Sequence, residues 1–217
     1  MPKKQLTEEE IEQIAIGLQD SKSQNRRKAA KKIGKNNLAE LGEILLAAFL
    51  KERNDKRTWE TQTEMIVALG KIGYSPALSF FKEIVGVNET EDMITHAAAR
   101  SYVRIKRSSL NDASPVIELL RFGKLSVLDG ATSALAYDDM TPPDDQIKMI
   151  IELLDKHKDE ELSIRGLMDP REYLLSCMSK CKIQTCSDYI NRFVDSPHRA
   201  LRECAELAKA GKKACYE

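Results

Sequence analysis

Apolar residues recur every three or four positions along most of the chain, as in Leu38, Leu41 and Leu45. This spacing places them on one face of an α-helix. Each such helix is followed by a second one that is richer in small residues, such as the alanines at 97–99. Small residues let neighbouring helices approach closely. Because no segment alternates apolar and polar residues over a strand's length, the pattern predicts an all-α fold.

Helix starts are marked by a capping side chain placed before a proline, which fits the first helical turn. The sequence contains four such pairs: Ser75-Pro76, Ser114-Pro115, Asp169-Pro170 and Ser196-Pro197. Asn88, with Glu91 three residues later, is expected to cap a helix in the same way. The complete pattern predicts six helical hairpins: 7–20 with 22–35, 38–53 with 56–73, 76–86 with 89–107, 114–123 with 125–139, 143–158 with 169–182, and 184–195 with 196–213.

The second helix of each hairpin carries a large apolar residue near its end: Ile33, Leu69, Tyr102, Leu135, Met178 and Leu207. The intervals between these residues are 36, 33, 33, 43 and 29. Periods in this range are typical of stacked units, each of which buries its apolar face against its neighbours. The sequence therefore predicts an α-α superhelix, an α-solenoid, that forms a single domain over residues 1–217. The longest interval holds an insertion at 157–168, which is either a functional loop or only a longer hairpin.

The ends of the second helices also carry a recurring motif: Ala68-Leu69-Gly70-Lys71-Ile72-Gly73, Lys32-Ile33-Gly34-Lys35, Ser101-Tyr102-Val103-Arg104-Ile105 and Ala134-Leu135-Ala136. Over about residues 7 to 213 the chain resembles the HEAT repeat family, an armadillo-type group of α-solenoids that includes bacterial short-repeat proteins. The resemblance implies that second helices line a concave surface. It also implies a non-enzymatic, protein-binding scaffold, of which regulators, assembly factors and toxin-neutralising immunity proteins are examples. A tetratricopeptide array is the alternative, but its Trp, Gly and Tyr positions at a fixed period of about 34 residues are absent.

Composition limits the partners and the cellular compartment that are expected for this fold. Basic and acidic residues number 34 each, so the net charge is zero and no global field attracts nucleic acid or a membrane. The N-terminus has no apolar signal segment, and the longest apolar run, 44–50, is too short to span a bilayer. All five cysteines lie in the last 41 residues without disulfide-scaffold spacing. Reduced thiols and a cytoplasmic location are therefore expected.

The net charge of zero conceals an uneven distribution, because acids dominate the first helices and bases dominate the second helices. The segment 22–35 contains no acid, and four of its lysines lie on one stripe. The candidate partner-binding residues are Arg27, Lys28, Lys31, Lys32, Lys35, Arg100, Arg104 and Arg107. The stripe is either a solvated face or an anion-binding groove. In the second case the expected partner is a protein with an acidic surface, or, as a weaker alternative, a nucleic acid.

Trp59 is the only tryptophan of the chain and stands at the start of a second helix. It is interpreted either as a staple over the hairpin turn or as a binding anchor. Tyr102 occupies the repeat's large apolar position, and the core is expected for it.

Catalytic and metal-binding motifs are absent from the sequence. The three histidines lie far apart, and no glycine-rich phosphate loop or nucleophile elbow occurs. Zinc would require convergence of the cysteine cluster Cys177, Cys181, Cys186 and Cys204, in which the first two share a helix face. These cysteines replace alanines of earlier units, which favours core packing. No metal, cofactor or enzymatic activity is therefore expected.

Two functional alternatives follow from other HEAT-like proteins. The first is a DNA-binding protein of the alkylpurine DNA glycosylase type, for which Asp129 and Arg104 are the nearest candidate residues. That class flanks its carboxylate with tryptophans, and Trp59 is the only one available here. The second is a phycobilin lyase-like protein, which no residue of this chain distinguishes.

Overall fold

The computed structural model describes residues 6–163 and 168–214, and every regular element within those ranges is helical. The prediction of an all-α fold is confirmed. The helices form six hairpins: α1 Glu8–Gly17 with α2 Ser23–Asn36, α3 Gly42–Glu52 with α4 Trp59–Lys71, α5 Leu78–Val87 with α6 Met93–Lys106, α7 Ser114–Leu120 with α8 Leu125–Tyr137, α9 Asp144–Leu154 with α11 Pro170–Met178, and α12 Gln184–Asn191 with α13 Arg199–Lys209. Short 3-10 turns at 39–41, 56–58 and 75–77 precede α3, α4 and α5.

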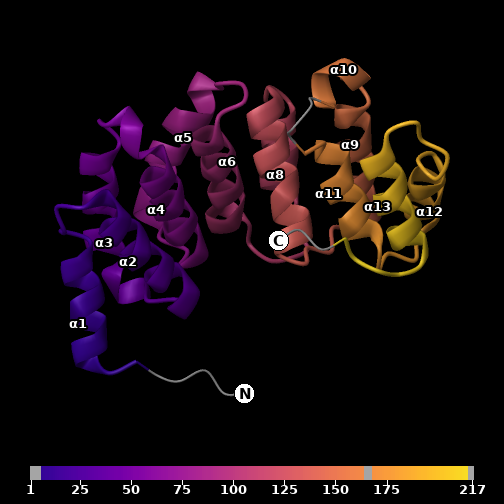
Figure 1. Ribbon diagram of the computed structural model, residues 1–217. Helices are drawn as coiled ribbons and strands as arrows, with labels where there is room; N and C mark the ends of the chain where they lie inside the picture. Colours follow the sequence, from indigo (N-terminus) through magenta and orange to yellow (C-terminus); the bar gives the residue numbers. More distant parts are fainter. Residues whose placement is uncertain (1–5, 164–167, 215–217) are drawn as a thin grey trace.

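The hairpins stack in sequence order into the curved row that Figure 1 shows, from α1 at one end to α12 and α13 at the other. The second helices α2, α4, α6, α8, α11 and α13 contact one another along the whole row, and we call them the inner layer. Neighbouring first helices contact each other much less. The more closely packed layer lies on the inside of a bend, so the inner layer forms the concave side of the solenoid.

Small residues explain how closely the helices of the inner layer approach. A Cβ added to Gly34 would lie 3.1 Å from the Cα of Ala68, and one on Gly130 would lie 2.3 Å from the carbonyl oxygen of His96. Between these two contacts, a Cβ on Gly70 would clash with Ser101, whose hydroxyl donates a buried hydrogen bond to a carbonyl of α4. The inner layer therefore depends on glycine at three successive helix contacts.

The loop between α5 and α6 differs from the sequence expectation. Asn88 does not cap the start of a helix; it ends α5 in the left-handed conformation with φ of 58°, and Asp92 caps α6 instead. The Asn88 side chain joins the next unit, since its amide donates to the Phe122 carbonyl and its oxygen accepts from the Lys124 amide. Asparagine tolerates this backbone conformation better than most residues.

The Ser-Pro pairs also behave differently from the prediction. Neither Ser75 nor Ser114 caps a helix, and Ser196 accepts a hydrogen bond before α13 rather than at its N-cap. Asp169 does cap α11, where it forms the reciprocal capping box with Glu172. Pro115 and Pro170 lie in the first turns of α7 and α11, as predicted, whereas Pro76 lies in the 3-10 turn before α5 and Pro197 precedes α13. Only the aspartate supplied the predicted cap.

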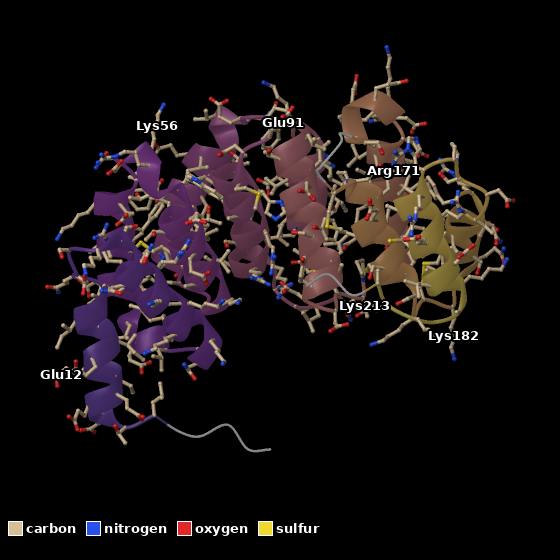
Figure 2. The ribbon with its side chains drawn as sticks, in the orientation of Figure 1. Glu12, Lys56, Glu91, Arg171, Lys182 and Lys213 are labelled. Atoms are coloured by element: carbon tan, nitrogen blue, oxygen red, sulfur yellow. A yellow bond between two sulfur atoms is a disulfide. The ribbon has the colours of Figure 1, made fainter. Side chains whose placement is uncertain are left out.

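The insertion between α9 and α11 contains a four-residue helix, α10 (Asp159–Leu162). Arg171 lies at the base of this segment, as Figure 2 shows, and binds Asp159 at 2.5 Å and Asp169 at 2.6 Å. The described part of the insertion is thus attached to α11. The rest of the predicted insertion includes residues 164–167, which lie outside the described residues.

The prediction of reduced thiols is wrong for one pair, because Cys181 and Cys186 form a disulfide. The prediction that Cys177 and Cys181 share a helix face is also wrong, since α11 ends at Met178. Cys186 and Cys204 are buried in the core, and the Cys177 thiol donates to the Met140 carbonyl at 3.3 Å.

One hydrophobic core follows the hairpins from Ile14 to Ala208. Within the described ranges, none of the helices combines the length and the apolar character needed to cross a membrane.

Candidate protein-binding surface

A groove of about 480 Å³ lies between α2 and α4 on the N-terminal half of the inner layer. Residues of both helices line it: Arg27, Lys28 and Lys31 from α2, and Trp59, Glu60, Thr63, Glu64 and Val67 from α4. The structure therefore brings part of the predicted basic stripe next to Trp59, for which the sequence left a staple and a binding anchor open. We call this feature the Trp59 groove.

Trp59 is accessible rather than covered, with 47% of its surface exposed. On its other side it lines a second groove with Ile84 and Ile94 of the next unit. Within the Trp59 groove, Thr63 and Val67 follow Trp59 at intervals of four residues along α4. The spacing places the three on one face of the helix, so Trp59 and Val67 form an apolar strip, interrupted by Thr63, on a wall that also carries Glu60 and Glu64.

The opposite wall is basic. Arg27 is occupied by an ion pair with Glu60. Lys28 and Lys31 are exposed, and neither makes an ion pair with a carboxylate of the described residues. Glu64 is an additional acid in the lining. A basic wall beside an apolar strip matches a segment that carries both apolar and acidic side chains.

The predicted stripe divides into two parts. Lys32 and Lys35 face the other way and line a groove of about 460 Å³ against α1, together with Glu9 and Glu10. These two lysines therefore lie in a locally acidic setting, unlike Lys28 and Lys31. The sequence did not show this division, because it depends on how α1 packs against α2.

Lys71 is a basic residue of this surface that the sequence analysis missed. It ends α4, and its aliphatic stem lies over Gly34 of α2. Burial lowers the pKa of Lys71, and the charges of Arg104, Arg100 and Lys31 lower it further. Lys71 therefore connects the cations of α2 with those of α6. Its only sequence signal was its place at a helix end, which equally fits the helix dipole.

Arg104 and Arg107, predicted as binding residues, are instead held by Asp138 at the end of α8. The ion-pair distances are 2.5 Å and 2.8 Å, and the three side chains are at most 16% exposed. Burial raises the pKa of Asp138, but hydrogen bonds from Arg104 and the charges of both arginines outweigh this and keep the pKa below its ordinary value. This cluster joins the third and fourth hairpins.

Arg100 lies between such pairs, with its guanidinium carbon 4.1 Å from the centre of the Tyr137 ring. Burial and the neighbouring charge of Arg104 lower its pKa to about 10. One turn earlier on α6, His96 contacts Asp129 at 2.9 Å. The two residues considered for a glycosylase are thus engaged with different partners, Asp129 with His96 and Arg104 with Asp138.

Within residues 6–163 and 168–214, no group of three or more His, Cys, Asp or Glu side chains is arranged to hold a metal ion. Tyr102 lies in the core, 4% exposed, as its place in the repeat predicted, and its hydroxyl donates to Glu118 at 3.0 Å.

No protein-family model matches the sequence, and no curated protein does. Among solved structures the chain is similar to a designed armadillo repeat protein, with 15% identity and a TM-score of 0.46 over 93% of this chain and 99% of the other. A second designed armadillo repeat protein, solved in complex with the peptide (KR)4, has 15% identity and a TM-score of 0.44 over the same shares. Human deoxyhypusine hydroxylase is 14% identical with a TM-score of 0.39, over 95% of this chain and 85% of the other. These likenesses concern the fold alone.

Proposed function

We propose that this protein is a non-enzymatic scaffold that binds a segment of a partner protein in the Trp59 groove. The partner segment would place an apolar side chain against Trp59 and Val67 and acidic side chains against Lys28 and Lys31. The observation that carries the proposal is the exposed Trp59 beside these lysines in one groove.

The energetics of interfaces support this assignment. Tryptophan is enriched among residues that dominate binding energy, because a large aromatic surface loses its water on contact. Exposed lysines add association rate and selectivity for acidic partners rather than large binding energy. The groove therefore provides one anchor and a basic rim.

The test compares two pairs of lysines on the same helix. In one variant Lys28 and Lys31 become glutamine, and in its matched control Lys32 and Lys35 become glutamine, so both lose two positive charges. Proteins captured from the source lysate, with and without nuclease treatment, are quantified by mass spectrometry for wild type, both variants and Trp59→Ala. We expect wild type and the control to capture a partner protein. The Lys28/Lys31 variant and Trp59→Ala should fail to capture it.

Equal capture by all four proteins would contradict the proposal, because the groove would then be only a solvated surface. Partners that disappear after nuclease treatment, together with affinity for duplex DNA at low salt, would instead favour the nucleic-acid alternative.

The proposal includes a regulatory or immunity-type role and a cytoplasmic location. The Cys181–Cys186 disulfide argues against the cytoplasmic location, since reducing compartments seldom retain such bonds.

A further inference from the structure

The inner face of α6 presents three cationic or ionisable side chains in one row, His96, Arg100 and Arg104, spaced four residues apart. The first contacts Asp129 at 2.9 Å, and the third binds Asp138 at 2.5 Å. Both acids lie on or at the end of α8, 33 and 34 residues later in the chain. At the same offset of 33 residues from Arg100 the chain has Ser133, whose hydroxyl donates within its own helix to the Gly130 carbonyl.

Arg100 is therefore the member of the row that makes no direct ion pair among the described residues, and of the acids only the more distant Asp138 acts on it. Its Nε is buried and makes no hydrogen bond. The Tyr137 ring covers one face of the guanidinium, and Tyr173 lies next to that ring with centroids 5.9 Å apart. Stacking stabilises a guanidinium through its face but leaves its hydrogen-bond donors at the edge unused. A buried donor without an acceptor is costly, which is unusual in a folded protein.

Resting on the function proposed above, we propose that Arg100 is a second specificity site, which binds one carboxylate of the segment held in the Trp59 groove. A carboxylate is planar, and its two oxygens match the two terminal nitrogens of arginine, which, unlike Nε, are not buried. It would also supply the negative charge that Asp129 and Asp138 supply to the neighbouring positions of the row.

The position of Arg100 relative to the groove sets the spacing of the ligand. The Ser101 hydroxyl binds the Ile66 carbonyl at 3.0 Å, so Arg100 lies level with Val67, which lines the groove. Trp59 lies eight residues before Val67, about 12 Å along α4, and neighbouring helix axes are about 8–10 Å apart. The separation from Trp59 to Arg100 is thus on the order of 15 Å, which about four or five extended residues span. Lys71, near both Lys31 and Arg100, keeps the surface between them basic.

The experiment uses the full-length protein and a fluorescent peptide, Glu-Leu-Glu-Ser-Gly-Ser-Glu, in which the last glutamate follows the leucine by five positions. A control peptide carries glutamine at that last position, and a third carries phosphoserine there. Binding of each is measured by fluorescence anisotropy to wild type, Arg100→Gln, Arg100→Lys and the Lys28/Lys31 glutamine variant. Circular dichroism establishes that each variant is folded.

We expect Arg100→Gln to weaken binding of the glutamate peptide about tenfold and to leave binding of the glutamine peptide unchanged. Arg100→Lys should fall in between, since it keeps the charge without the planar fork. The inference is overturned if Arg100→Gln weakens the glutamate and glutamine peptides equally, or weakens neither, while the Lys28/Lys31 variant still binds the glutamate peptide more weakly than wild type does. The inference is also overturned if the phosphoserine peptide binds far more tightly than the glutamate peptide and Arg100→Gln weakens only the phosphoserine peptide. Arg100 would then be a phosphate site. If wild type binds none of the peptides up to about 1 mM, or the Lys28/Lys31 variant binds like wild type, the groove proposal itself fails.

Discussion

Arg104 on α6 and Asp138 at the end of α8 lie 34 residues apart and are joined by hydrogen bonds of 2.5 to 3.0 Å. The separation is one repeat, so this pair connects equivalent positions of consecutive hairpins. Other contacts follow the same rule, such as Arg27 with Glu60 and Arg53 with Glu83, 33 and 30 residues apart. Consecutive hairpins are therefore held together by polar contacts with the period of the sequence, in the inner layer and between first helices, and a repeat array gains much of its stability at such interfaces.

Asp138→Asn is expected to destabilise the protein by about 3 kcal/mol, because it leaves Arg104 and Arg107 buried without a counter-charge. Urea denaturation followed by circular dichroism measures the loss. The neighbouring change Asp139→Asn is the control: this aspartate is 64% exposed and pairs with Lys213, which Figure 2 shows near the end of α8. Its loss should cost under about 1 kcal/mol. Equal effects of both changes would mean that the buried cluster contributes no more than a surface pair.

The same cluster predicts a dependence on pH. The pKa of Asp138 is lowered in the folded protein from its ordinary value of 3.8. Its contribution to stability is therefore complete above that value and is lost as the pH falls through the lowered pKa. Wild type and Asp138→Asn should differ fully at neutral pH and converge in strong acid. Denaturation curves at a series of pH values measure this, and a difference that stays constant into acid would rule out the charge as its cause.

The sequence predicted the hairpins well because apolar spacing and proline placement are local signals. It failed where the outcome depends on a neighbouring unit. The segment from Asn88 to Glu91 has the spacing of a capping box, yet Asn88 is drawn into a left-handed turn whose side chain bonds to the next hairpin. Asp92 then caps α6.

The sequence predicted residues that contribute to the candidate site, but it did not predict how they are arranged. A helical wheel places Lys28, Lys31, Lys32 and Lys35 on one stripe, and only the position of α1 divides them between two grooves. The sequence predicted Arg104 and Arg107 as binding residues because their acid, Asp138, lies a full repeat away and the pairing is not visible in it. Pairing across repeats is a property of packing, and single residues do not reveal it.

Gly130→Ala is expected to destabilise the protein by about 1–3 kcal/mol, since the new Cβ would meet the His96 carbonyl oxygen at 2.3 Å and push α8 from α6. Gly86→Ala is the matched control. It also lies in a helix, but a Cβ there has no heavy atom within 4 Å. Alanine should therefore stabilise α5 at that position, by about 0.5 kcal/mol. Thermal unfolding distinguishes the two, and similar melting temperatures for both variants would show that the inner layer tolerates wider helix spacing.

The Cys181–Cys186 disulfide gives the last prediction, because it closes the turn between α11 and α12. Closing so short a loop restricts the unfolded chain only modestly, so reduction should cost about 2 kcal/mol. Denaturation with and without a reductant measures the loss, and a protein with both cysteines changed to serine should match the reduced wild type in either condition. Digestion without reduction should yield the cross-linked peptide. If all cysteines of the native protein react with a thiol reagent under denaturing, non-reducing conditions, the bond does not form, and the cytoplasmic prediction is strengthened instead.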